Sequence, residues 1–158
     1  MKRRTYQRKS ETQTNENNLQ EITHQATIIS SSSKEGNGVE HLLDKDDNTF
    51  WESSGDKPHS ITFIFNEYRN IALIRIRVIH AEDGMYVPSK IITCAGKALY
   101  DMNVIGKIGI GKNMPEFFDV YKDLNKPINA NCISISFQDV HENGMDCRVR
   151  DIEIYELE

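Results

Sequence analysis

The sequence predicts an all-β fold in which two antiparallel sheets pack face to face, as a β-sandwich or jelly roll. Three stretches alternate apolar and polar residues at the period of a β-strand: residues 74–78, 133–137 and 151–154. Turn-forming residues such as Ser54-Gly55-Asp56 separate the apolar runs. Only residues 39–43 suggest a helix, of one or two turns. About eight short strands without a long helical pattern are typical of a sandwich.

Strands are expected wherever a short apolar run recurs after His24. The runs occupy residues 26–29, 61–65, 71–79, 90–95, 98–102, 104–110, 117–121, 132–137 and 149–157. In the last run Ile152 and Ile154 alternate with two acids. This alternation predicts that the isoleucines face the core and that Asp151 and Glu153 face solvent. The single tryptophan, Trp51, is expected in the core at one end of the sandwich.

The first 21 residues are expected to form a disordered polar tail, followed by one domain over residues 22–158. After the initiator methionine, Tyr6 and Leu19 are the large apolar residues of this stretch, which is too few to form a core. Five cations between Lys2 and Lys9 make its start basic. Two interpretations stay open for these cations, a solvated tail and a nuclear-import signal.

Charge and hydropathy argue against several functional classes. The chain has a net charge of -5 despite its basic start, so its body is acidic and we expect no binding to nucleic acid. We expect no membrane span, because no run of about 18 apolar residues occurs. The three cysteines are widely spaced and are expected to be reduced thiols. These features favour a location in the nucleus and cytoplasm.

Motifs for catalysis or metal binding are incomplete. Residues 106–112 follow the glycine spacing of a phosphate-binding loop, but the flanking residues are typical of strands rather than of a helix. Asp44-Lys45-Asp46-Asp47-Asn48 resembles the start of a calcium loop that lacks its later ligands. A structural calcium and a simple turn capped by Asp44 both stay open. We expect no catalytic residues, no cofactor and no enzymatic activity.

Three loops carry the most distinctive residues, and together they point to a family. The loops are residues 50–59, 86–91 and 141–146, accompanied by residues 31–39, 42–44 and 150–155. In this order the segments resemble the Doc domain family, best known as subunit 10 of the anaphase-promoting complex. The resemblance extends from His24 to Tyr155, which is nearly the whole expected domain.

The resemblance implies a jelly roll like that of galactose-binding domains. It also implies a non-catalytic, substrate-recognising subunit of this ubiquitin ligase, which acts in the cell cycle with the other subunits and a propeller-shaped coactivator. Such a subunit serves as co-receptor for destruction-box degrons, which are extended Arg-x-x-Leu-type peptides, and it increases the processivity of ubiquitination. By the family motif, the degron-binding residues are Ser89, His141, Asn143, Gly144, Asp146 and Arg150. For two of them a structural role stays open as an alternative: Asp146 as a residue that holds its own turn together, and Arg150 as a buried ion-pair partner.

The chain differs from many family members at its C-terminus, and two alternative functions stay open. Many family members continue into a tail that ends in Ile-Arg, whereas this chain ends at Glu156-Leu157-Glu158; docking through a side of the jelly roll is therefore expected. A carbohydrate-binding jelly-roll module is the first alternative, with Tyr86, Phe50 or Trp51 as stacking residues. The second is a Doc-like domain that recruits substrates to another ubiquitin ligase.

Overall fold

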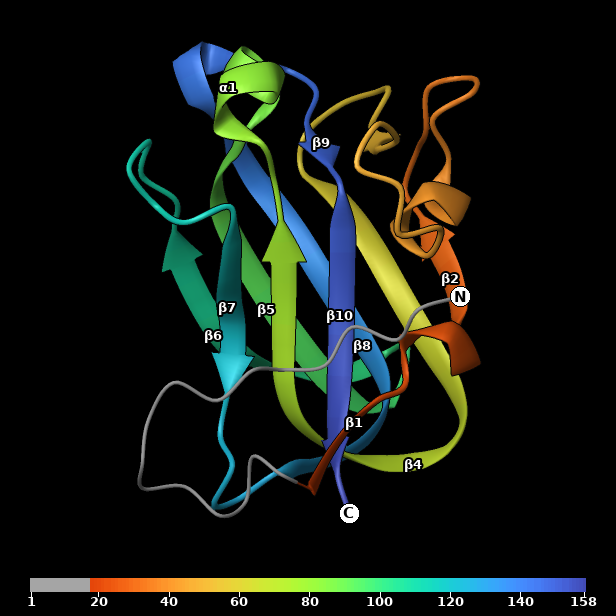
Figure 1. Ribbon diagram of the computed structural model, residues 1–158. Helices are drawn as coiled ribbons and strands as arrows, with labels where there is room; N and C mark the ends of the chain where they lie inside the picture. Colours follow the sequence, from red (N-terminus) through yellow and green to blue (C-terminus); the bar gives the residue numbers. More distant parts are fainter. Residues whose placement is uncertain (1–17) are drawn as a thin grey trace.

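The computed structural model describes residues 18–158 (Figure 1). The expected basic tail and its import signal lie outside the described residues. The described part contains ten strands and five short helical segments, which follow in chain order. They are β1 (Leu19–Glu21), η2 (Thr23–Gln25), β2 (Thr27–Ser30), η3 (Val39–Leu42), β3 (Trp51–Glu52), β4 (His59–Arg77), α1 (His80–Asp83), η4 (Gly84–Tyr86), β5 (Pro88–Ala98), β6 (Asp101–Gly109), β7 (Phe117–Lys122), β8 (Ile128–Val140), η5 (His141–Asn143), β9 (Arg148–Val149) and β10 (Asp151–Leu157).

The strands form two packed layers that share one strand, as predicted for an antiparallel jelly roll. Hydrogen bonds connect the strands in the order β1-β10-β4-β8-β5-β6, with β2 and β7 also pairing with β4. The start of β4 pairs with β2 and β8, whereas residues 73–77 pair with β7 and β10. In Figure 1, β4 descends in one layer, bends at the bottom and rises in the other.

The bend in β4 explains why two predicted strands are one. The apolar runs at 61–65 and 71–79 are separated by Asn66, Glu67 and Tyr68, which are exposed. The pairing register with β8 shifts between Ile64 and Arg69, so the strand continues through a bulge instead of a turn. This bulge turns the apolar side chains of both halves toward one core.

The core lies between the layers and is made of large apolar side chains. Trp51, Phe63 and Phe137 are fully buried, as the sequence predicted for Trp51. The rings of Trp51 and Phe137 lie 5.7 Å apart, and the indole Nε1 of Trp51 donates a hydrogen bond to the carbonyl oxygen of Ser32 at 3.1 Å. Burial of such rings is the main source of stability in a sandwich of this size.

The expected solvent face of β10 is buried, which corrects the sequence interpretation. Asp151 and Glu153 are 2% and 1% exposed. Lys45 covers them, with its Nζ 3.4 Å from a carboxylate oxygen of each and 3.2 Å from Glu21 Oε2. The hydroxyl of Tyr155 donates to Glu153 Oε1 at 3.1 Å. We call Lys45, Glu21, Asp151 and Glu153 the β10 acid cluster.

The domain begins earlier than the boundary expected at Ile22. Leu19, Gln20 and Glu21 pair with the end of β10 as strand β1, so part of the expected polar tail belongs to the sheet. The short strand was missed because three residues with one apolar side chain give no recognisable period. Among residues 18–158, no helix is long and apolar enough to span a membrane.

The remaining motifs are structural in the described chain. Residues 101–109 form strand β6 instead of opening a helix, as the strand-like residues of this segment predicted. Asp44 accepts hydrogen bonds from the Thr49 hydroxyl at 2.7 Å and the Asp46 amide at 3.0 Å, so it caps a turn. Within residues 18–158, no group of three or more His, Cys, Asp or Glu is placed to hold a metal.

All three cysteines lie in the described chain and carry free thiols, as expected. Cys132 and Cys147 are buried. Burial raises the pKa of Cys147 to about 12, so this thiol stays protonated and unreactive at neutral pH.

Candidate functional site

The candidate site lies at the end of the sandwich where the long strands begin or finish, at the top of Figure 1. We call this region the loop end: it comprises α1, η4, η5, the β3–β9 pair and the loops around them. The backbone joins two of these segments, because the His141 amide donates to the Val87 carbonyl at 2.9 Å. Loops held on a rigid sheet are the usual place for recognition in such folds.

A half-open pocket of about 320 Å³ separates α1 from η5. Ala81 and Val87 form its apolar wall, and His80, Lys112, His141 and Glu142 line its polar part. Lys112 Nζ lies 3.3 Å from Glu142 Oε1 at the exposed rim. The Nε2 atoms of His80 and His141 are buried without a hydrogen-bond partner among the described residues. The pocket therefore offers unsatisfied polar atoms beside apolar surface.

Three of the predicted degron-binding residues, Ser89, His141 and Asn143, lie near this pocket. Ser89 follows η4 at the start of β5, and His141 and Asn143 form the ends of η5. Asn143 is exposed and Ser89 half-buried. Neither side chain makes a hydrogen bond within the part of the chain that the structure describes. Both can therefore donate to, and accept from, an added peptide.

Gly144 is buried and serves the loop itself. A side chain at this position would meet the Met85 carbonyl oxygen at 2.7 Å, so only glycine fits. Positive φ in this turn occurs at Glu142 and Asn143, both at 58°, whereas Gly144 has a φ of -63°. Asparagine tolerates this conformation better than most residues. The turn thereby presents the Asn143 side chain at the surface.

Asp146 binds a neighbouring loop of its own chain. Its Oδ1 accepts hydrogen bonds from the Ser53 hydroxyl at 2.9 Å and from the Gly55 amide at 3.3 Å. His59, which is 1% exposed at its side chain, donates from Nε2 to the Met145 carbonyl at 2.5 Å. These bonds hold residues 141–146 against residues 53–55 and give the loop a fixed shape.

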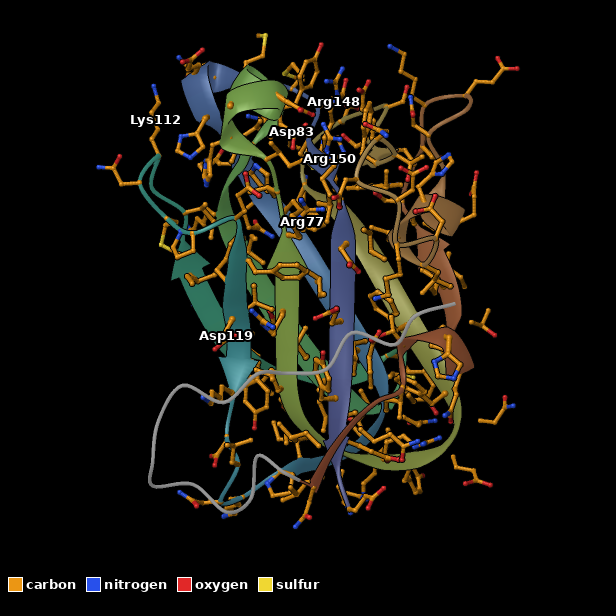
Figure 2. The ribbon with its side chains drawn as sticks, viewed as in Figure 1. Arg77, Asp83, Lys112, Asp119, Arg148 and Arg150 are labelled. Atoms are coloured by element: carbon orange, nitrogen blue, oxygen red, sulfur yellow. The ribbon has the colours of Figure 1, made fainter. Side chains whose placement is uncertain are left out.

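Arg150 is a buried ion-pair partner, which is the role that the sequence left as an alternative to ligand contact. Its Nη2 donates to Asp83 Oδ1 at 2.7 Å and its Nη1 to the Asp47 carbonyl at 2.9 Å. Arg150 and Asp83 are 5% and 1% exposed. Asp83 also accepts from the Ile79 amide at 2.9 Å, so the pair holds α1 in place (Figure 2).

The sequence reasoning missed one residue at the loop end, Arg148. Its guanidinium lies 4.5 Å from the Phe50 ring centroid and 4.0 Å from that of Tyr86. We call these three residues the arginine stack. The alternation Arg148-Val149-Arg150 was a usable signal, since it places both arginines on one side of the chain. No sequence pattern joins Phe50, Tyr86 and Arg148, which come from three distant segments.

Comparison with known proteins identifies the family. The family model for "Anaphase-promoting complex, subunit 10 (APC10)" matches residues 2–157. A Dictyostelium discoideum protein of that name is 34% identical over 143 residues, covering 87% of this chain and 73% of the relative. The Homo sapiens protein is 30% identical over 138 residues, covering 87% and 75%. "Anaphase-promoting complex subunit DOC1" of Saccharomyces cerevisiae is 32% identical, covering 85% and 55%.

Solved structures similar to this chain share its fold. A family 32 carbohydrate-binding module of NanJ from Clostridium perfringens, in complex with galactose, superposes with a TM-score of 0.73 at 17% identity, covering 87% of this chain and 99% of the module. The C-terminal domain of a chitobiase from Bacteroides fragilis gives 0.67 at 20% identity, covering 85% and 96%. The galactose-binding-like jelly roll expected from the sequence is thus confirmed, and at such identities the likeness concerns the fold alone.

The sequence relatives and the fold agree with the resemblance drawn from the loops. The relatives are named as subunits of the anaphase-promoting complex and none as an enzyme, in agreement with the expected non-enzymatic role. Other subunits of that complex are accordingly the partners of this chain. With the family model matched from residue 2 to residue 157, the chain belongs to the family of anaphase-promoting complex subunit 10.

Proposed function

We propose that this chain recognises substrates for the anaphase-promoting complex. In this role it acts with a propeller-shaped coactivator as co-receptor for destruction-box degrons, and it increases the processivity of ubiquitination. The observation that carries the proposal is the open pocket between α1 and η5, beside side chains without partners in residues 18–158. A binding surface without catalytic groups is what a co-receptor needs.

Ser89, His141 and Asn143 are the proposed contacts with the degron. Asn143 can both donate to and accept from the backbone of an extended peptide, and Ser89 can do the same with one hydroxyl. His141 has a buried Nε2 that lacks a partner in the described chain, so a peptide group that reached it would satisfy it. Gly144, Asp146 and Arg150 support the site by holding its loops. For Asp146 and Arg150 this is the alternative to direct contact that the sequence left open, whereas Gly144 was expected to contact the degron.

Weak contacts suffice for this function. A disordered degron loses conformational entropy when it binds, so a few polar contacts give low affinity by themselves. When a coactivator holds the same peptide, binding to the second surface becomes intramolecular and the residence time grows without a tight site. Longer residence lets more ubiquitin be added in each encounter.

A triple variant tests the proposal. Ser89→Ala, His141→Ala and Asn143→Ala together should change the free energy of unfolding by less than about 1 kcal/mol, because none of the three side chains makes a hydrogen bond within residues 18–158. Reconstituted complex carrying this variant should attach shorter ubiquitin chains to a destruction-box substrate in a single-encounter assay. Its incorporation into the complex should persist.

The matched control carries His24→Ala, Thr27→Ala and Asn103→Ala, three exposed positions in η2, β2 and β6. This control should give the chain lengths of the unmodified complex. Equal chain lengths in the triple loop variant and the control would contradict the proposed contacts.

The carbohydrate alternative gains no support from the aromatic residues of the loop end. Trp51 is fully buried. The rings of Phe50 and Tyr86 already stack on the guanidinium of Arg148. Because Trp51 is buried and the other two rings are in contact with Arg148, we expect no retention on galactose resin. A location in the nucleus and cytoplasm, where a cell-cycle ubiquitin ligase acts, is part of the same proposal.

A further inference from the structure

The arginine stack holds a guanidinium in a fixed plane at the surface of the loop end. Phe50 precedes β3, Tyr86 ends η4 and Arg148 begins β9, so three segments converge on one group. The distances of 4.5 and 4.0 Å from the guanidinium carbon to the two ring centroids are those of cation–π contact. Figure 2 shows Arg148 at the loop end, above Arg150.

Only one edge of the Arg148 guanidinium is used. Its Nε donates to Glu52 Oε1 at 2.5 Å. Among residues 18–158, neither Nη atom of Arg148 donates to any acceptor, and its side chain keeps 22% of its surface exposed. The two Nη groups of Arg148 are therefore available as donors to a ligand, and stacking already fixes their orientation.

The neighbouring Arg150 is different, because its donors are satisfied. It binds Asp83 and the Asp47 carbonyl, lies 3.3 Å from Glu82, and has a side chain that is 4% exposed. It also stacks at 4.7 Å from the Phe50 ring. Arg150 thus fixes Phe50, and Phe50 in turn helps to fix Arg148.

The charge around Arg148 favours a singly charged anion. Glu52, 5% exposed, is shared between Arg148 and Lys34, whose Nζ lies 3.6 Å from it. Two cations and one carboxylate leave one positive charge. A carboxylate matches both this single charge and the two-pronged geometry of a guanidinium.

We propose that Arg148 is a carboxylate subsite that reads an acidic residue of the bound peptide. The inference rests on the proposed function, since Tyr86 lies three residues before Ser89 and Arg148 lies beside the 141–146 loop. Because stacking already orders the Arg148 side chain, less side-chain entropy is lost when a ligand binds. Arg148 can therefore bind a carboxylate more tightly than a mobile surface arginine would. The carboxylate belongs to a Glu or Asp side chain of the peptide.

The test uses nuclear magnetic resonance titration of the full, ¹⁵N-labelled chain at low ionic strength. The parent probe is a peptide amide that carries Arg-x-x-Leu followed by six glutamines. Six further peptides each replace one glutamine with glutamate, and one carries the parent sequence with a free C-terminal carboxylate. A peptide of six glutamates and one of six glutamines, both without Arg-x-x-Leu, complete the set.

We expect glutamate at one position to tighten binding about fivefold, the effect of one favourable ion pair. The gain should weaken as salt is added. It should disappear in the double variant Glu52→Gln/Arg148→Gln, which avoids leaving Glu52 buried without Arg148, and fall in Arg148→Lys, which keeps the charge but loses the fork. The control Lys107→Gln, which removes an exposed cation on β6, should keep the gain.

The outcomes separate this inference from the proposed function. If the parent peptide binds but no glutamate helps, or the gain survives in Glu52→Gln/Arg148→Gln, the carboxylate subsite is wrong and the co-receptor role stands. A gain limited to the free-acid peptide also contradicts a side-chain carboxylate. If the parent fails to bind, the degron proposal falls. Shifts of the Arg148 Nε–H signal with the six-glutamate but not the six-glutamine peptide would still support the subsite, and their absence would overturn it.

Discussion

Residues 148–153 contribute to two charged clusters of opposite character. In the β10 acid cluster, Asp151 and Glu153 are almost fully buried under Lys45, and Glu21 of β1 closes the edge. In the arginine stack, Arg148 keeps 22% of its side chain exposed and two nitrogens without an acceptor in the described chain. The two clusters are separated along the chain by Arg150.

The difference shows how similar residues acquire different roles. A cluster covered by its own chain contributes to the stability of the fold, because removing its cation leaves buried carboxylates with less compensation for their charge. The guanidinium of Arg148, which is held by stacking and has free donors in the described chain, is instead available to bind a ligand. Local sequence does not distinguish them, because both are strand-like segments of alternating charge and apolar residues.

The most damaging way to break the arginine stack is to remove the core beneath it. Trp51 pairs with Val149 across β3 and β9, next to the Glu52–Arg148 pair. Trp51→Ala should reduce the free energy of unfolding by about 3–5 kcal/mol, as is typical of a buried tryptophan. Denaturant titration should show a molten or insoluble protein. A well-folded variant that had lost only ligand binding would make Trp51 a contact residue.

Arg150 sharpens the contrast with Arg148. Arg150→Met should reduce the free energy of unfolding by about 3 kcal/mol, because Asp83 is left buried without its guanidinium. The double variant Asp83→Leu/Arg150→Met should recover much of this loss, since no unpaired charge remains. Arg148→Lys should change stability by less than about 1 kcal/mol. Equal losses at Arg148 and Arg150 in thermal and denaturant unfolding would contradict the distinction.

Lys45 is the equivalent test for the β10 acid cluster. Lys45→Met should reduce the free energy of unfolding by about 2–3 kcal/mol at neutral pH, because Asp151 and Glu153 lose their shared cation. Lys107→Met, at an exposed position on β6, is the control and should be nearly neutral. A loss in Lys45→Met no larger than that in Lys107→Met would contradict the role of Lys45 in the cluster.

The acid cluster also predicts a dependence of stability on alkaline pH. Burial lowers the pKa of Lys45, but Asp151, Glu21 and Glu153 together raise it above its ordinary value. Burial and Glu153 also raise the pKa of Tyr155. Both groups therefore stabilise the fold fully below about pH 10, the unfolded-state value, and lose this contribution as pH rises further. The unfolding free energy should fall less steeply with pH in Lys45→Met.

The smallest effect is expected at the edge of the same cluster. Glu21→Gln removes a carboxylate whose side chain is 12% exposed, while Lys45 keeps Asp151 and Glu153. The change should stay within about 0.5 kcal/mol. A loss as large as that of Lys45→Met would show that β1, rather than Lys45, holds the cluster together.

The alternation of Ile74, Ile76 and their neighbours was enough to predict a sandwich, because one buried face imposes a period of two. The same rule was wrong for Asp151 and Glu153, which it placed in solvent. Lys45, from a distant loop, covers this face of β10, and alternation within the strand carries no information about it. Two strands were predicted where β4 is continuous, because exposed residues at a bulge look like a turn. The loop residues Ser89, His141 and Asn143 could be placed at one end by family resemblance.

The arginine stack could not be predicted in the same way. The contacts of Arg148 with Phe50 and Tyr86 depend on how three loops meet, and no spacing in the sequence encodes that meeting. A buried ion pair of Arg150 was foreseen only as one of two alternatives, and its partner Asp83 could not be named from the sequence. What the sequence lacks in each case is the position of a partner far along the chain.

Strand β4 belongs to both layers of the sandwich, and this has a consequence for biosynthesis. Residues 73–77 of β4 need β10, which follows Asp151 near the end of the chain. At typical translation rates, this neighbour is made roughly 4 to 15 s after Arg77. During that interval one edge of β4 has no partner strand and can pair with another nascent chain. We therefore expect this edge to be prone to co-translational aggregation until β10 has been made.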